Sequence, residues 1–128
     1  GGEPAGPRLA SLAGRRIASG DPLRRNKTSA RQVYDEALAE LGADSPVFDV
    51  VFLNERGEVA EGARSNVFVE RRGVLLTPPL ASGALPGVLR EDLLAAGQAV
   101  EAVLWPDDLT HGFLLGNALR GLIPVRLE

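Results

Sequence analysis

The chain has 128 residues, of which 45% are hydrophobic and 24% are charged, and its formal net charge is -3. This composition is ordinary for one compact domain with a hydrophobic core, which disfavours a disordered chain. Basic residues are scattered among acidic ones, no apolar run approaches the roughly 20 residues of a membrane span, and the first residues lack a signal-peptide pattern. We therefore expect no nucleic-acid partner, no membrane partner and a cytoplasmic location.

Scarce residue types narrow the possible chemistry. The chain has no Cys and a single His, His111, which leaves little for a zinc site or a histidine-based triad, so no metal is predicted. The chain also has no Met, and we interpret it as part of a longer polypeptide. Lys27 is the only lysine among 14 basic residues, and arginine cannot replace an amine nucleophile. Taken alone, Lys27 is either required by the chemistry or left over in an Arg-rich composition.

The first part of the chain predicts little regular structure. Residues 1–8 are rich in Gly and Pro without periodicity, and we interpret them as a linker or ragged end before one domain over 9–128. A weakly apolar stretch over 9–17 predicts an edge strand. Residues 19–22, Ser-Gly-Asp-Pro, predict a turn, which places Lys27 soon after a loop.

The clearest helix lies between Ala30 and Leu41, where apolar residues recur at helical spacing. Ser29 and Gln32 resemble a capping box, and Gly42 suits the position after the last turn. The spacing therefore places Lys27 immediately before the helix.

The rest of the chain predicts mainly short strands. Residues 47–54 and 66–70 are rich in β-branched and aromatic residues and predict two strands, with a tight turn after the first. A second turn predicts a hairpin between 66–70 and the segment VLLT. The remaining predicted elements are a helix from Pro86 to about Gly97, a strand over 99–105, a helical turn over 106–110, and strands over 112–115 and 122–127. The sequence thus predicts a mixed α/β domain without the alternation of a doubly wound sheet.

Three further segments contain candidate site residues. Taken alone, Glu61 in the segment EGARSNVF is typical of a solvated carboxylate in a turn. Pro86, in SGALPGVLR, predicts a helix start where the amides of Gly87, Val88 and Leu89 attract a phosphate, although an ordinary helix cap also explains the segment. Asn117, in GNALRG, is either a turn residue or a phosphate donor.

Together these motifs resemble a known family. EGARSNVF, LLT and LPGVLR at these separations resemble the signature of the fold-type IV pyridoxal-phosphate enzymes, which include branched-chain and D-amino-acid aminotransferases and aminodeoxychorismate lyase. The resemblance covers about residues 20–128, and RNKTSARQVYDEA is similar to the family's lysine segment. It implies the larger C-terminal domain of that fold, with a mixed sheet curled into a pseudo-barrel. The family's small N-terminal domain has no counterpart in these residues.

The resemblance assigns the central chemistry to two residues. Lys27 would attach pyridoxal 5'-phosphate covalently and move protons at the substrate carbon, and Glu61 would keep the pyridine nitrogen protonated. A carboxylate beside that nitrogen favours the pyridinium and strengthens the electron sink. Ser65 and Asn66 match the motif and are expected to shape the turn.

Further positions follow for the cofactor phosphate and ring. The amides of Val88 and Leu89 and the side chain of Asn117 match positions that bind the phosphate. Arg31, one helical turn beyond the lysine, is placed near the cofactor ring without an assigned role, with a surface charge as the alternative. Tyr34 belongs to the apolar face of its helix and is expected in the core.

Within the family, the sequence resembles the lyases most. Asn117 followed by Ala-Leu is similar to the lyase members, whereas aminotransferases usually have a hydroxyl residue there. This resemblance implies loss of pyruvate from 4-amino-4-deoxychorismate to give 4-aminobenzoate for folate synthesis. The segments NERGEVAEGARSNVFVE and GNALRGLIPVRL also resemble lyase domains that are fused to or associated with a chorismate-using synthase, and the family implies a homodimer. Ala30 departs from an Asn often found three residues after the lysine. The alternatives are a D-amino-acid or branched-chain aminotransferase and a non-catalytic association domain.

Overall fold

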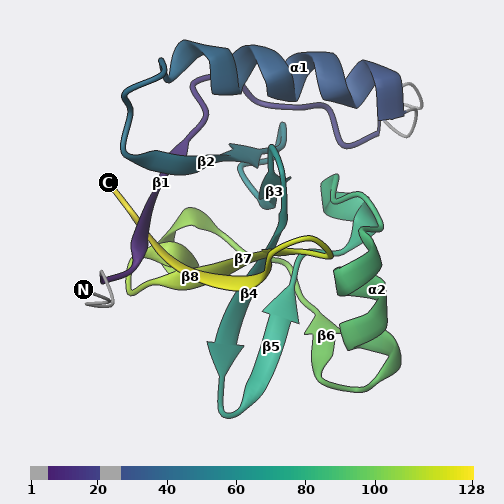
Figure 1. The fold of residues 1–128 in the computed structure, drawn as a ribbon. Coiled ribbons are helices and arrows are strands. Elements are labelled where there is room, and N and C mark those ends of the chain that lie inside the picture. Colours follow the sequence, from purple (N-terminus) through teal and green to yellow (C-terminus); the bar gives the residue numbers. More distant parts are fainter. Residues whose placement is uncertain (1–5, 21–26) are drawn as a thin grey trace.

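The computed structural model describes residues 6–20 and 27–128, without the side chains of 27–30. Eight strands form one curled sheet in the order β3-β2-β1-β8-β7-β4-β5-β6, which confirms the predicted mixed α/β fold (Figure 1). The strands are β1 (Arg8–Leu12), β2 (Val47–Leu53), β3 (Val59–Gly62), β4 (Asn66–Arg71), β5 (Val74–Thr77), β6 (Ala99–Glu101), β7 (Phe113–Asn117) and β8 (Gly121–Leu127). In the described residues the helices are α1 (Lys27–Glu40) and α2 (Val88–Ala95), with short 3-10 helices η2 (Leu80–Ser82) and η3 (Pro106–Leu109).

The first strand, β1, lies inside the sheet. It pairs in parallel with β2 on one side and with β8 on the other, so the prediction of an edge strand was wrong. The strand is also shorter than predicted, and Ile17 continues the pairing only as an isolated bridge to Asn54. Weak apolarity suggested an edge, but both neighbours of β1 come from distant parts of the chain, which local composition does not reveal.

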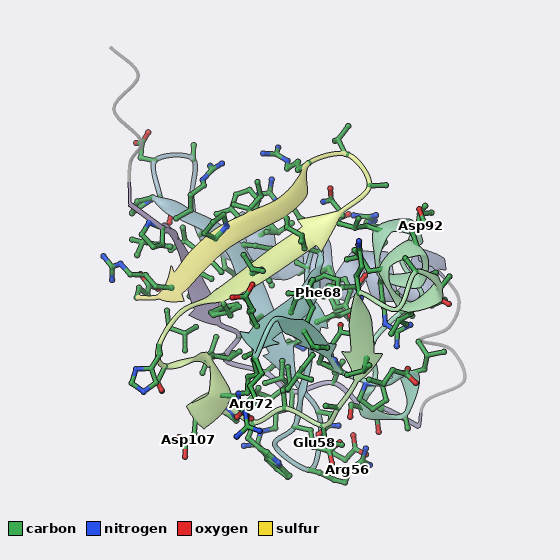
Figure 2. All side chains as sticks on the ribbon, turned by 90° about the horizontal axis from the view of Figure 1, so that it is seen from below. Arg56, Glu58, Phe68, Arg72, Asp92 and Asp107 are labelled. Carbon is green, nitrogen blue, oxygen red and sulfur yellow. The ribbon has the colours of Figure 1, made fainter. Side chains whose placement is uncertain are left out.

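Buried apolar side chains cover both faces of β2. Val50 and Phe52 belong to a cluster beneath α1 that includes Tyr34, whereas Val51 belongs to a second cluster on the other face. This alternation follows from the two-residue repeat of a strand. Figure 1 shows α1 lying over β2, and Figure 2 shows Phe68, which is fully buried, near the centre of the molecule. The sheet is therefore packed on the face that meets α1 and on the opposite face.

The first helix begins earlier than the sequence predicts. Its first residue is Lys27, and Ser29 already has helical conformation, so the capping box of Ser29 and Gln32 was wrong. A capping residue needs non-helical backbone angles, which Ser29 does not have. Lys27 thus lies in the first turn of α1 and not before it. Gly42 has a φ of 79°, which confirms its predicted place just beyond the helix. None of the described helices is long and apolar enough to cross a membrane.

Three other boundaries differ from the prediction. Glu61 lies within β3, a strand that the sequence analysis missed, and not in a loop between strands. The second helix begins at Val88 after Gly87, which has an extended conformation, so Pro86 does not start the helix. The strand predicted over 99–105 is limited to Ala99–Glu101, because the chain leaves β5 after the amide of Ala102 bonds to Thr77.

Candidate active site

An open cavity of about 230 Å³ lies where α1, the start of α2 and two turns of the sheet meet. Of the predicted site residues, Arg31, Glu61, Val88 and Asn117 line this cavity. Leu89, whose backbone amide is the predicted ligand, is not among the lining residues. The structure therefore brings together four predicted residues that are widely separated in the sequence.

Glu61 is buried beside this cavity, with 3% of its surface exposed. Its Oε2 accepts a hydrogen bond of 2.5 Å from the hydroxyl of Tyr34. Its Oε1 accepts bonds from the amide of Leu85, at 2.8 Å, and from the side-chain nitrogen of Asn66, at 3.4 Å. A solvated turn carboxylate, the alternative for this residue, is therefore excluded. The carboxylate is held in one orientation by donors from three different segments.

Tyr34 is buried as predicted, but it also has a polar contact that the sequence analysis missed. Its ring packs against Phe52, with 4.8 Å between the ring centroids, while its hydroxyl bonds to Glu61. A buried tyrosine hydroxyl usually finds a polar partner, which was the available signal. Because Tyr34 lies inside the core cluster, its partner had to be a buried acceptor on the sheet.

Lys27, Arg31 and Tyr34 occupy one stripe of α1. Their spacing of four and three residues places their backbone positions on the same face of the helix. Arg31 and Tyr34 from this stripe line the cavity. Lys27 is two turns before Tyr34, about 10 Å along the helix axis, and its side chain lies outside the described residues.

The start of α2 supplies backbone donors to the cavity. The amide of Gly87 bonds to the carbonyl oxygen of Leu85 at 2.8 Å, so its predicted role as a phosphate donor was wrong. Val88 and Leu89 are the first two helical residues, and amides in a first turn have no acceptor within the helix. The helix dipole adds partial positive charge there. This end of α2 therefore suits an anionic group.

Asn66 joins this helix start to the acid. Its side-chain nitrogen donates to the carbonyl oxygen of Leu85 at 3.0 Å as well as to Glu61. A Cβ on Gly87 would lie 2.4 Å from Oδ1 of Asn66, so only glycine allows this approach. Asn66 was expected only to shape the turn, and it also positions two parts of the site.

Asn117 acts as a turn residue at the edge of the cavity. Its Nδ2 donates to the carbonyl oxygen of Arg64 at 2.8 Å, and its Oδ1 accepts from the amide of Arg120 at 2.8 Å. The first bond uses one of the two hydrogens on Nδ2. The side chain is thus held at the cavity wall, which is compatible with its predicted role as a phosphate donor.

Two arginines also line the cavity. Nη1 of Arg31 lies 3.9 Å from Oδ1 of Asp35 in an exposed ion pair. At this distance and exposure the attraction is weak. Arg64 lies on the turn between β3 and β4 and is exposed. Both are positively charged residues in the lining of the cavity that the buried Glu61 also lines.

Comparison with known proteins identifies the family. Residues 2–127 match the sequence model described as amino-transferase class IV, so the chain belongs to the class IV aminotransferase family. This confirms the family that the motifs predicted. Members of this family depend on pyridoxal phosphate.

The similar proteins include both lyases and aminotransferases. A Schizosaccharomyces pombe protein named "Putative aminodeoxychorismate lyase" is 37% identical over 101 residues, covering 74% of this chain and 44% of that protein. A Thermotoga maritima protein named "Probable branched-chain-amino-acid aminotransferase" is 36% identical over 86 residues, covering 62% of this chain and 32% of that protein. The solved structure of a "Putative amino-acid aminotransferase" from Mesorhizobium loti is 45% identical in sequence, with a TM-score of 0.86. The match covers 95% of this chain and 60% of that one. The chain therefore spans 32% to 60% of the length of these relatives.

The groups around the cavity fit pyridoxal phosphate. Glu61 supplies a buried acid for a ring nitrogen, and the amides at the start of α2 supply donors for a phosphate. The stripe of α1 that includes Lys27 faces the same cavity through Arg31 and Tyr34. A buried acid, a helix start and one face of α1 thus meet at one cavity.

Proposed function

We propose that this chain is the cofactor-binding part of a pyridoxal-phosphate-dependent lyase that converts 4-amino-4-deoxychorismate to 4-aminobenzoate and pyruvate. The observation that carries the choice of reaction is the presence of two arginines, Arg31 and Arg64, in the lining of the cavity that Glu61 also lines. The 37% identity to a protein named as such a lyase supports the same choice.

The charge of the cavity favours a substrate with more than one carboxylate. 4-Amino-4-deoxychorismate has two carboxylates and one amine, whereas a branched-chain amino acid has one of each. Two arginines near one reaction space attract the additional negative charge, and a guanidinium binds a carboxylate through paired hydrogen bonds.

Each predicted residue has a distinct task in this proposal. The cofactor, when bound, supplies an electron-withdrawing ring that stabilises negative charge on the substrate carbon. Lys27 holds the cofactor and moves a proton at that carbon. Glu61 keeps the ring nitrogen protonated, and Tyr34, through its bond to Glu61, fixes the direction of the carboxylate.

The phosphate is assigned to the start of α2 and to Asn117. The amides of Val88 and Leu89 and the side chain of Asn117 would donate to its oxygens, as helix starts commonly do for phosphates. Holding the phosphate there fixes the ring relative to Glu61. The proton transfer by Lys27 then takes place in a defined orientation.

An amino-acid aminotransferase is the second candidate function. It is favoured by the likeness to the Mesorhizobium loti aminotransferase structure, which is 45% identical with a TM-score of 0.86. That reaction would use the same lysine and the same acid. It differs in needing a keto acid to accept the amino group.

Product analysis separates the two reactions. The full-length protein with pyridoxal phosphate is incubated with 4-amino-4-deoxychorismate and no keto acid, and 4-aminobenzoate and pyruvate are measured. The lyase proposal expects both products in equal amounts, and none with Lys27→Ala. Conversion of branched-chain or D-amino acids only when a keto acid is present would instead establish the aminotransferase.

We further propose that the protein is a homodimer and is fused to or associated with a chorismate-using synthase. The segments NERGEVAEGARSNVFVE and GNALRGLIPVRL resemble lyase domains that are fused to such a synthase, which supports the association. The mass of the full-length protein in solution, measured by light scattering, tests the dimer. Copurification with synthase activity tests the association.

A further inference from the structure

Asp49, on β2, is a buried acid outside the lining of the cavity. Its side chain is fully buried. Oδ2 accepts hydrogen bonds from the hydroxyl of Ser65 at 2.7 Å and from the amide of Arg64 at 3.2 Å. Oδ1 accepts a bond from the amide of Val50 at 2.8 Å. Burial of a carboxylate is costly unless it is compensated, and here the compensation comes mainly from one turn.

That turn, residues 62–65, closes tightly around the carboxylate. The amide of Gly62 bonds to the carbonyl oxygen of Ser65 at 2.8 Å. A Cβ on Gly62 would lie 2.6 Å from Oδ2 of Asp49 and 2.6 Å from Oγ of Ser65. Because there is no room for a side chain at Gly62, the carboxylate and the turn fit together in one arrangement. Burial raises the pKa of Asp49, and the bonds from Ser65, Val50 and Arg64 oppose that rise.

Arg64 connects the buried acid to Asn117. Its amide donates to Asp49, and its carbonyl oxygen accepts the bond from Nδ2 of Asn117 at 2.8 Å. Oδ1 of Asn117 in turn accepts from the amide of Arg120. The backbone of Arg64 therefore links the buried carboxylate, on one side, to a side chain at the cavity wall, on the other. The two contacts of Asn117 also decide which end of its amide group faces Arg64.

We infer that Asp49 is a positioning residue: through Ser65 and the backbone of Arg64, it orients the side chain of Asn117 and thereby sets the affinity for a phosphate group. This inference rests on the proposed assignment of Asn117 to the cofactor phosphate. Asp49 does not touch the cofactor. A loss of its acceptor oxygens would shift the 62–65 turn and move the carbonyl oxygen that holds Asn117.

Comparison of pyridoxal phosphate with pyridoxal, which lacks the phosphate, tests the inference. The affinity of the full-length protein for each compound is measured by absorbance titration for the wild type and for Asp49→Asn. This variant keeps the size of the side chain and removes one acceptor. The expected result is a roughly three- to tenfold loss of affinity for pyridoxal phosphate, as for one disrupted hydrogen bond, with little change for pyridoxal. Equal losses for both compounds, or no loss, would overturn the inference.

A double-mutant cycle shows whether the effect passes through Asn117. The Asp49→Asn substitution is repeated in an Asn117→Ala background, where we expect it to have no further effect on affinity for pyridoxal phosphate. A loss of the same size in both backgrounds would overturn the inference.

Ser65→Ala removes only the hydroxyl donor and replaces Asp49→Asn in these titrations if Asp49→Asn does not fold. The control Thr77→Val removes a buried hydroxyl bonded to Val67, outside the cavity lining, and should leave the preference for phosphate unchanged.

The wild type separates this inference from the function on which it rests. If the wild type binds neither compound, or binds both equally, the assignment of the phosphate site fails. If it prefers pyridoxal phosphate and Asp49→Asn keeps the full preference, only the role of Asp49 fails.

Discussion

The hydroxyl of Tyr34 donates a 2.5 Å hydrogen bond to Oε2 of Glu61, and this bond connects α1 to β3 at the cavity. The two residues are 27 positions apart in the sequence. The contact makes the orientation of the predicted ring-nitrogen acid depend on the packing of the helix that includes Lys27. Movement of α1 would therefore change both the amine and the acid of the site.

Replacement of Tyr34 by Phe should lower the stability of the fold while the packing of the hydrophobic core is kept. The ring remains packed against Phe52, but Oε2 of Glu61 loses a donor. We expect the free energy of unfolding to fall by about 1–3 kcal/mol, as for a buried polar group deprived of one partner. Urea denaturation measures this change. Tyr34→Leu, which also removes the ring, should cost more. An unchanged free energy of unfolding in Tyr34→Phe would contradict a role for the hydroxyl.

Lys27 should be the one residue that becomes covalently attached to pyridoxal phosphate. Borohydride reduction of the protein with the cofactor, followed by mass spectrometry of peptides, should find a single modified lysine in the wild type and none in Lys27→Ala. Lys27→Arg should behave like Lys27→Ala, because a guanidinium remains protonated and does not react with an aldehyde.

The matched control adds a lysine elsewhere. Arg16→Lys places a second amine on an exposed residue outside the cavity lining. Its new lysine should remain unmodified while Lys27 is still labelled. Modification of both lysines to the same extent would mean that the labelling reflects exposure and not a site.

Gly87→Ala should disturb the start of α2. The added Cβ would lie 2.4 Å from Oδ1 of Asn66, so either the helix start or Asn66 must move. We expect a loss of about 1–3 kcal/mol in stability, as for other overpacked positions, together with weaker binding of pyridoxal phosphate. Gly14→Ala is the control, since no atom lies within 4 Å of its added Cβ. Similar effects for the two variants, in thermal melts and in titrations, would contradict the close approach seen at Gly87.

Glu58 should contribute stability that is lost in acid. Its carboxylate accepts bonds from Arg56, Asn54 and Ser82, and Figure 2 shows Arg56 and Glu58 beside each other. The bonds from Arg56, then Asn54, lower the pKa of Glu58 from 4.5 to about 2. Because the pKa is lower in the folded state, this contribution is present above pH 4.5 and disappears as the pH falls through about 2.

Acid denaturation of Glu58→Gln tests this dependence. Between pH 4.5 and about 2, the free energy of unfolding should fall more steeply for the wild type than for Glu58→Gln. Glu40→Gln removes a charge from an exposed position on α1 and controls for net charge. Parallel curves for the wild type and Glu58→Gln would show that the folded state does not favour the ionised carboxylate.

Local patterns in the sequence predicted the elements whose structure depends on nearby residues. The apolar stripe of α1, the strand β2 and the hairpin of β4 and β5 were all recognised, since helices, strands and tight turns are largely set by neighbours in the sequence. The motifs around Glu61 and Val88 were recognised for a different reason, the resemblance to a family.

Contacts between distant segments were not predicted. The place of β1 between β2 and β8, the bond from Tyr34 to Glu61 and the bonds of Asp49 each join segments separated by many residues. Asp49 in particular stands inside an apolar run, where its charge gave no sign of a partner in the turn at residues 62–65. Such partners depend on how the sheet is assembled, which periodicity does not specify.

The parallel pairing of β1 with β8 also has a consequence for folding. Early in synthesis, β1 can meet β2, but its other edge stays without a partner until β8 has left the ribosome. Pairings between such distant segments are slow to form, because a long loop must close before any contact rewards it. A nascent chain therefore carries an unprotected strand edge from the synthesis of β1 until that of β8, and this edge is where we expect chaperones to bind or aggregation to start.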